Sequence, residues 1–294
     1  MTTLKYPYLR LHFLVLLWAF TAILGLLISL SYIEVVFYRT LFSALALAVI
    51  IATGRSSFTL PPRAALQLLL TGVIIALHWL LFFGAARYAN ASVSLIGLST
   101  TTLWTSFLEP AAYRRRISMV QVVFGLAVIG GLYIIYKDDF AYGTGLLMSL
   151  GSALMAAVFS VLNHRFVRRF APLQISFYEM LGAWLGTLPF LWLLAPAGQQ
   201  AIHLPGLSDT GYLLILALVC TVYAYTESTR LLRQLSAFAS NLVINLEPVY
   251  GIVLALLFFG ERERMNAGFY LGASAIMIAV LAYPVVKRRF NLGA

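Results

Sequence analysis

Residues Ser236–Glu261 read SAFASNLVINLEPVYGIVLALLFFGE. The stretch is long and apolar enough to cross a bilayer, since about 20 apolar residues span the hydrocarbon core. Near its middle stand Asn241, Asn245 and the pair Glu247–Pro248. A charged side chain at that depth costs about 2.5–3.5 kcal/mol even on the milder insertion scales, and a proline removes a backbone hydrogen bond. We therefore expect this segment to line a transport site, because only protein or a watery cavity satisfies such groups.

The composition is that of a polytopic membrane protein. The chain has 294 residues, of which 62% are hydrophobic and 10% are charged, against about 25% charged residues in a typical soluble domain. The first apolar segment is too long for a cleaved signal peptide. One cysteine, Cys220, excludes an internal disulfide and a multi-cysteine metal site. The net charge of +10 comes from cations beside apolar spans rather than from a continuous basic face, so we expect no nucleic-acid partner.

Hydropathy predicts an all-α integral membrane protein with ten transmembrane helices and no soluble domain. Most lysines and arginines fall on the side of the two termini, which places both termini in the cytoplasm and the protein in the plasma (inner) membrane as a multi-pass protein. The expected segments are approximately 10–30, 34–53, 65–86, 91–112, 117–136, 143–164, 173–195, 210–230, 237–259 and 266–286.

The chain also repeats itself. The stretch from Ile33, IEVVFYRTLFSALAL, resembles the stretch from Leu173, LQISFYEMLGAWLGT, and weaker matches follow in the same order. We expect two five-helix repeats, 1–140 and 141–294. Because five is odd, the halves enter the membrane in opposite directions, which is the inverted-repeat plan of secondary transporters, with a central cavity near the midplane.

The sequence resembles a known family, the EamA-type proteins of the drug/metabolite transporter superfamily. The likeness covers nearly the whole chain and rests on FYRTLFSALAL, ALHWLLFFGAARYANAS, CTVYAYTESTRLLRQLSA and NLEPVYGIVLALLFFGERERMNAGFYLGASAIM. The resemblance implies that helices 1, 3, 4, 6, 8 and 9 surround a central cavity. It also implies alternating access and small substrates, often amino acids or amines. The fourth helix departs from the family pattern, because Ser99–Thr102 stand where a proline is usual. That departure argues against a symmetric hinge.

Glu247 is the leading candidate, either pairing with a substrate amine or carrying the coupling proton, and a purely structural carboxyl is the alternative. On a straight helix Asn245 and Pro248 lie almost opposite Glu247. We expect Glu247 to face the cavity, Asn245 to contribute if the helix turns, and Pro248 to act as the hinge.

Other candidate substrate-binding residues are aromatic or polar. Aromatic faces beside a carboxylate suit a cationic or aromatic substrate, although each aromatic side chain alone is more often packing. His78 can bind substrate or simply join two helices. The candidates are Trp18, Trp79, Trp104, Tyr225 and Tyr250, with His78 and, from the hydroxyl-rich fourth helix, Thr101.

Arg39 and Glu179 occupy equivalent positions in the two halves, in FYR and FYE. A buried charge needs a partner, so we expect these two to be structural charges that pair with each other or with helix ends.

The sequence thus predicts a secondary active transporter of a small polar metabolite, an amino acid or an organic amine, with protons as the candidate coupling ion. The alternative is a flippase or exporter for amphipathic or lipid-linked compounds. An enzyme is not expected, since His12, His78, His164 and His203 are scattered. We expect no metal and no cofactor. The partners are the substrate and the lipid bilayer, and the protein is a monomer or weak homodimer.

Overall fold

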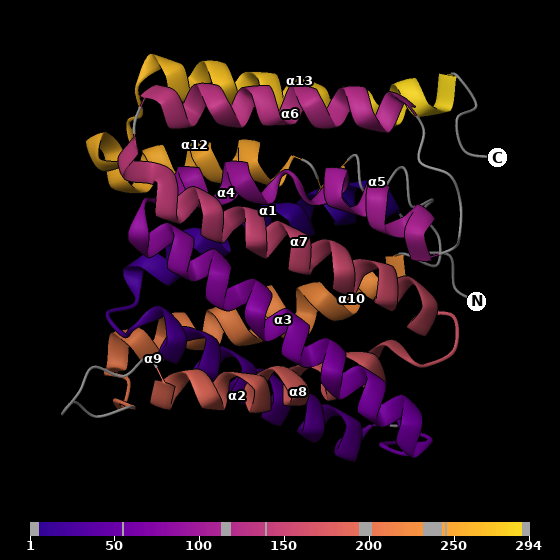
Figure 1. Cartoon of the computed structure of the whole chain (residues 1–294). Coiled ribbons are helices and arrows are strands. Elements are labelled where there is room, and N and C mark those ends of the chain that lie inside the picture. Colours follow the sequence, from indigo (N-terminus) through magenta and orange to yellow (C-terminus); the bar gives the residue numbers. More distant parts are fainter. Residues whose placement is uncertain are drawn as a thin grey trace.

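The computed structural model describes residues 6–54, 56–112, 119–138, 140–193, 202–231, 243–244 and 246–289. These residues are helical apart from short connections (Figure 1). The first half contains α1 (Pro7–Leu27), α2 (Tyr32–Thr53), α3 (Pro62–Tyr88), α4 (Ala91–Leu98), α5 (Thr101–Ala112) and α6 (Met119–Asp138). The second half contains η1 (Phe140–Tyr142), α7 (Gly143–Phe166), α8 (Pro172–Leu193), α9 (Leu207–Leu214), η2 (Ile215–Tyr223), α10 (Ala224–Leu231), α12 (Glu247–Phe259), η3 (Gly260–Glu263) and α13 (Ala267–Arg289).

Two of the predicted spans are divided into consecutive elements here, and the span around Glu247 is described below. α4 and α5 are two pieces of the fourth span, and α9, η2 and α10 run on as one helix with a π-helical middle. Counted in this way, the described residues contain the ten predicted helices. Five helical stretches are long and apolar enough to cross a membrane by composition and length, namely Pro7–Leu27, Tyr32–Thr53, Pro62–Tyr88, Gly143–Phe166 and Leu207–Leu231.

The two halves pack into each other rather than side by side. α3 packs against both α7 and α8, α2 against α8, and α1 and α4 against α12. α6 and α13 form a pair at one edge of the bundle, and α2 with α8 lies at the other (Figure 1). Contacts between halves therefore surround the centre of the molecule.

Small residues permit the closest of these contacts. A Cβ atom on Gly182 of α8 would lie 2.1 Å from the carbonyl oxygen of Leu69 on α3, and one on Gly72 would lie 2.2 Å from the carbonyl oxygen of Glu179. Only glycine allows such close approach of two helix backbones, a common device where lipid supplies no hydrophobic drive for association. The α3–α8 contact fixes Glu179 next to the centre.

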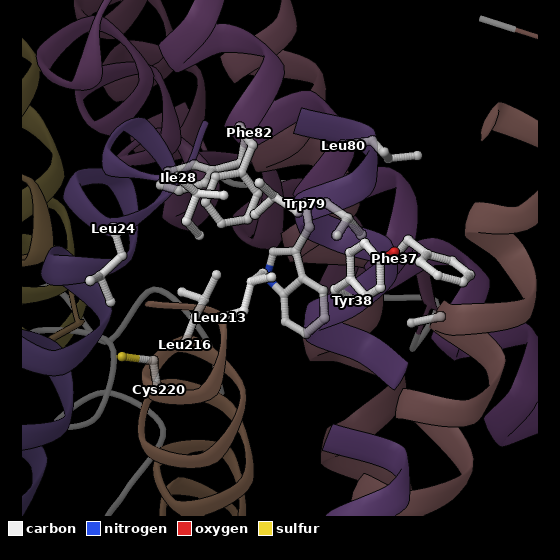
Figure 2. Packing of buried hydrophobic residues seen from close by; sticks show 14 of the residues in the cluster. Leu24, Ile28, Phe37, Tyr38, Trp79, Leu80, Phe82, Leu213, Leu216 and Cys220 are labelled. Carbon is white, nitrogen blue, oxygen red and sulfur yellow. The ribbon is translucent and has the colours of Figure 1, made fainter. Parts of the chain in front are cut away.

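The main hydrophobic cluster lies where α1, α2, α3 and the α9–η2 helix meet. Figure 2 shows Trp79 of α3 at its middle, with Leu24 of α1, Tyr38 of α2 and Leu216 of η2 around it. This cluster positions the helices that line the site described below.

The fourth span is interrupted at Ser99 and Thr100, between α4 and α5. The hydroxyls of Ser99, Thr100 and Thr101 donate to the carbonyls of Ile96, Gly97 and Leu98, at 2.6, 2.7 and 2.7 Å. Such bonds compete with the helical backbone and bend helices. The fourth span is thus interrupted without a proline, and the absence of a symmetric hinge stays a prediction.

In the second half, α12 begins at Glu247, and Pro248 stands in its first turn. Proline is tolerated there, because the first N–H groups of a helix have no intrahelical partner. The backbone N–H of Leu246 bonds to the carbonyl of Val243, three residues back, at 3.0 Å. Glu247 thus stands at a helix N-terminus rather than in the middle of a continuous helix. A hinge motion at Pro248 stays a prediction.

Candidate functional site

A cavity of about 290 Å³ lies at the centre of the bundle, lined from both halves. Its lining includes residues of the helices expected around it, α1, α3, α4–α5, α7, η2–α10 and α12. Arg39 of α2 and Ile175 of α8 add to that set. The volume lies at the small end of ligand pockets, which run to about 1,000 Å³, so the cavity suits a small molecule.

Glu247 supplies the cavity with a carboxylate. Among the described residues, no hydrogen bond or ion pair of this side chain is present. The N-terminus of α12 carries partial positive charge, which favours a carboxylate at this position. Glu247 is therefore a carboxyl group directed at a ligand site.

Arg39 lines the same cavity although it is only 3% exposed. Its Nε donates to the hydroxyl of Thr221 at 2.8 Å, and its guanidinium lies 4.0 Å from the ring centroid of Trp79. The terminal nitrogens, Nη1 and Nη2, make no hydrogen bond among the described contacts, and Nη1 is fully buried. A buried guanidinium with free donors is costly unless an acceptor reaches it, and its planar edge matches a carboxylate.

Of the two arrangements expected for Arg39 and Glu179, pairing with each other is not the one seen among their described contacts. Arg39 contacts Thr221 and Trp79, whereas Glu179 contacts Tyr225 and Asn163. The two residues match in sequence position, yet each faces different neighbours. Arg39 also lines the cavity, and a structural role for both charges stays a prediction.

His78 on α3 also lines the cavity, and its ring contacts Ser152 of α7. Its Nδ1 lies 3.0 Å from the carbonyl oxygen of Ser152 and 2.8 Å from its hydroxyl, which in turn donates to the carbonyl of His78 at 3.0 Å. A carbonyl only accepts, so Nδ1 carries the proton of the neutral ring and Nε2 is left as an acceptor. The residue joins two helices and offers a lone pair as well.

A second acidic cluster lies behind the cavity wall. The hydroxyl of Tyr225 donates to Oε2 of Glu179 at 2.8 Å, and Nδ2 of Asn163 lies 3.4 Å from the same oxygen. Glu179 is 0% exposed, and its Oε1 and the Oδ1 of Asn163 are buried without a hydrogen-bond partner. Tyr225 and Asn163, but not Glu179, belong to the cavity lining.

Most of the residues singled out from the sequence meet at this cavity. Its lining includes Glu247, Trp18, Trp79, His78, Tyr225, Thr101 and Pro248. Their binding of a substrate stays a prediction.

Tyr250 and Trp104 do not line the cavity. The hydroxyl of Tyr250 lies 2.8 Å from Nδ1 of His12, joining α12 to α1. Trp104 directs its indole Nε1 into a buried site without a hydrogen-bond partner. Asn245 lies outside the described residues.

The sequence reasoning missed Asn163, Thr21, Ser160 and Thr221, which also line the cavity. Asn163 had a usable signal, since an amide within an apolar span is itself expensive. The hydroxyl residues had none, because serine and threonine commonly satisfy their own helix.

The lining reaches the end of the bundle where α1 begins and α7 ends, at His164, Val167 and Leu231. Polar contacts hold the opposite end, where α1 ends and α2 begins. Ser29 donates from its N–H and its hydroxyl to Asp209 at 2.9 and 2.5 Å. Arg87 donates to the carbonyls of Gly25, Ile28 and Leu30, and Glu34 accepts from the backbone N–H of His203.

Comparisons with known proteins agree with this architecture. The sequence model of the EamA-like transporter family matches residues 8–137 and 143–283, once in each half. An uncharacterized transporter of Haemophilus influenzae is 21% identical over 269 residues, covering 84% of this chain and 83% of that protein. The uncharacterized transporter YwfM of Bacillus subtilis is 21% identical over 230 residues, covering 75% of this chain and 73% of that protein.

A solved crystal structure superposes with a TM-score of 0.64 at 19% identity, covering 98% of this chain and 99% of the other. That likeness shows the fold. With the family match in both halves, it confirms the predicted class, an all-α membrane transporter built from two repeats rather than an enzyme: this chain belongs to the EamA-like transporter family.

Proposed function

We propose that this transporter is a secondary carrier of a small zwitterionic metabolite, an amino acid or a close amine relative, working by alternating access. The observation that carries the proposal is the pair of opposite charges on one small cavity. Glu247 and Arg39 both line it, and neither has an ion-pair partner among the described residues. A zwitterion brings an ammonium for the carboxylate and a carboxylate for the guanidinium.

The remaining lining supports the same substrate class. Trp18, Trp79 and Tyr225 give aromatic surface for a side chain or a cation. Thr101 and His78 add polar groups that orient a bound molecule. A small-molecule site usually has a largely apolar wall that carries a few polar groups.

A series of compounds that share a side chain and differ in their charged groups tests the proposal on purified protein. Phenylalanine, phenethylamine and 3-phenylpropionate share one side chain and differ only in charge, and leucine with isoamylamine repeats the comparison for an aliphatic chain. Thermal-shift binding and saturable counterflow in proteoliposomes are the measurements. We expect the amino acids to bind more tightly than either singly charged analogue.

Two results contradict this proposal. Absence of saturable binding and flux across a panel of all amino acids and their amines removes it. Saturable movement of acyl-chain or lipid-linked compounds alone favours the flippase or exporter instead.

We propose further that the protein lies in the inner membrane with both termini in the cytoplasm, and that the halves divide at 1–140 and 141–294. The charge bias of the loops supports the orientation, and the family matches at 8–137 and 143–283 support the division. A monomer or weak homodimer remains our expectation.

The orientation is testable with introduced cysteines, since Cys220 is the one native cysteine. In a Cys220→Ala background, single cysteines at each terminus should resist an impermeant maleimide in intact spheroplasts and react after permeabilisation. Labelling of either terminus from outside contradicts the orientation.

A further inference from the structure

We propose that Glu179, hydrogen-bonded by Tyr225 and Asn163 of the cavity wall, binds the coupling proton, so that one carboxyl, Glu247, meets the substrate and another carries the coupling proton. The inference rests on the proposed transport function. It differs from the sequence-based expectation, in which Glu247 carried both roles.

Burial and hydrogen bonding of Glu179 carry the argument. The side chain is 0% exposed within a bundle that spans the membrane. Its Oε2 receives one good hydrogen bond, from Tyr225 at 2.8 Å, and a long one from Asn163 at 3.4 Å, while Oε1 receives none. An ionised carboxylate needs several donors or a cation to offset its desolvation, and here it has neither. In this arrangement the carboxyl is therefore held in its protonated form.

The charged and titratable groups on the helices around Glu179 make their described contacts with residues other than Glu179. On α2 and α3, Arg39 contacts Thr221 and Trp79, and His78 contacts Ser152. On α7, His164 contacts Arg168. On α10, Glu227 forms ion pairs with Arg10 and Arg230. On α8 itself, Tyr178 donates to the carbonyl of Phe58. Among the described residues, Tyr225 is thus the titratable side chain that hydrogen-bonds to Glu179.

The side chains of Tyr225 and Asn163 lie between the carboxyl of Glu179 and the cavity. Tyr225 and Asn163 contact Glu179 on one side and line the cavity on the other. They come from α10 and α7, helices around the cavity that alternating access must move. When these helices separate, cavity water reaches the carboxyl. The proton passes from Glu179 to that water, leaving a carboxylate and a hydronium ion, and no other bond is broken.

Transport in proteoliposomes tests the division of roles. Wild type, Glu179→Gln and the control Glu261→Gln, an exposed glutamate near the end of α12, are compared in counterflow of labelled phenylalanine at equal pH and in accumulation driven by a pH gradient. We expect Glu179→Gln to keep counterflow within about twofold of wild type and to lose gradient-driven accumulation. Unchanged accumulation, or equal loss of both activities, overturns the proposal.

Infrared difference spectroscopy between two pH values tests the proton site without any substrate, so failure of the transport proposal leaves it intact. The C=O stretch of a protonated buried carboxyl should be present in wild type and in Glu261→Gln, and absent in Glu179→Gln. Tyr225→Phe keeps the carboxyl and should move this band to higher frequency, because it removes the phenol hydrogen bond. A band unaffected by both Glu179→Gln and Tyr225→Phe overturns the proposal.

Discussion

Arg39 on α2 and Glu179 on α8 stand at matching positions of the two repeats and are both buried, yet they meet the cavity differently. Arg39 lines it directly and keeps free donors on its guanidinium. Glu179 lies one layer behind, covered by Tyr225 and Asn163. The repeat therefore preserves backbone architecture while the chemistry of the two halves diverges.

The consequence is a cavity whose charges come from different halves. The first half contributes a cation, Arg39, and the second a carboxylate, Glu247. A carrier whose halves move relative to each other must change the spacing of these two groups. A zwitterion that binds both charges thus prefers one arrangement of the halves, and differential binding of this kind is what drives a conformational equilibrium.

Removal of the second half's charge should have the largest effect. Glu247→Gln deletes a charge-assisted hydrogen bond worth about 1.5–3 kcal/mol, so the affinity for phenylalanine and for phenethylamine should fall roughly ten- to hundredfold. Thermal-shift titration measures both affinities. Glu261→Gln, whose side chain is 83% exposed, is the matched control and should bind as wild type does. Equal affinities in Glu247→Gln and wild type would return Glu247 to a structural role.

Removal of the first half's charge should be more selective. Arg39→Gln should reduce the preference for phenylalanine over phenethylamine about tenfold, because only the amino acid presents a carboxylate to the guanidinium. The ratio of the two affinities cancels general damage to the fold. Arg264→Gln, at an exposed arginine with 71% of its side chain accessible, should leave the ratio unchanged. A preserved ratio in Arg39→Gln would remove the cation from the site.

Substitution of the proline at the start of α12 should have the smallest effect. Pro248→Ala should change the free energy of unfolding by less than about 1 kcal/mol, since a first-turn proline replaces no intrahelical hydrogen bond. Thermal unfolding in detergent measures this change. A gain near the roughly 3 kcal/mol typical of prolines inside helices would show that Pro248 interrupts a continuous helix in the native protein.

The helices were predictable because each is an apolar run of membrane-spanning length, and that signal is local. The interruption at Ser99–Thr100 was not, because a hydroxyl bonding its own helix leaves no distinct mark in composition. Glu247 was found because a carboxylate is expensive wherever it stands in a span. Tyr250 and Trp104 were expected at the cavity but are not among its lining residues, because aromatic side chains serve lipid contact, core packing and ligand binding alike. The role of Arg39 depends on which face of α2 is directed at the cavity. Because α2 is apolar on all sides, its sequence does not indicate that face.

The contacts between Ser29 and Asp209 and around Arg87 also bear on kinetics. They join the turn after α1 to the start of α9 and the end of α3. We expect these contacts to separate when the cavity opens at that end. Hydrogen bonds of charged groups contribute about 1.5–3 kcal/mol each, so loss of the Asp209 carboxylate should raise the resting population of the other conformation by roughly tenfold or more. We therefore expect Asp209, which is not among the residues lining the cavity, to affect transport only through the balance between the two conformations.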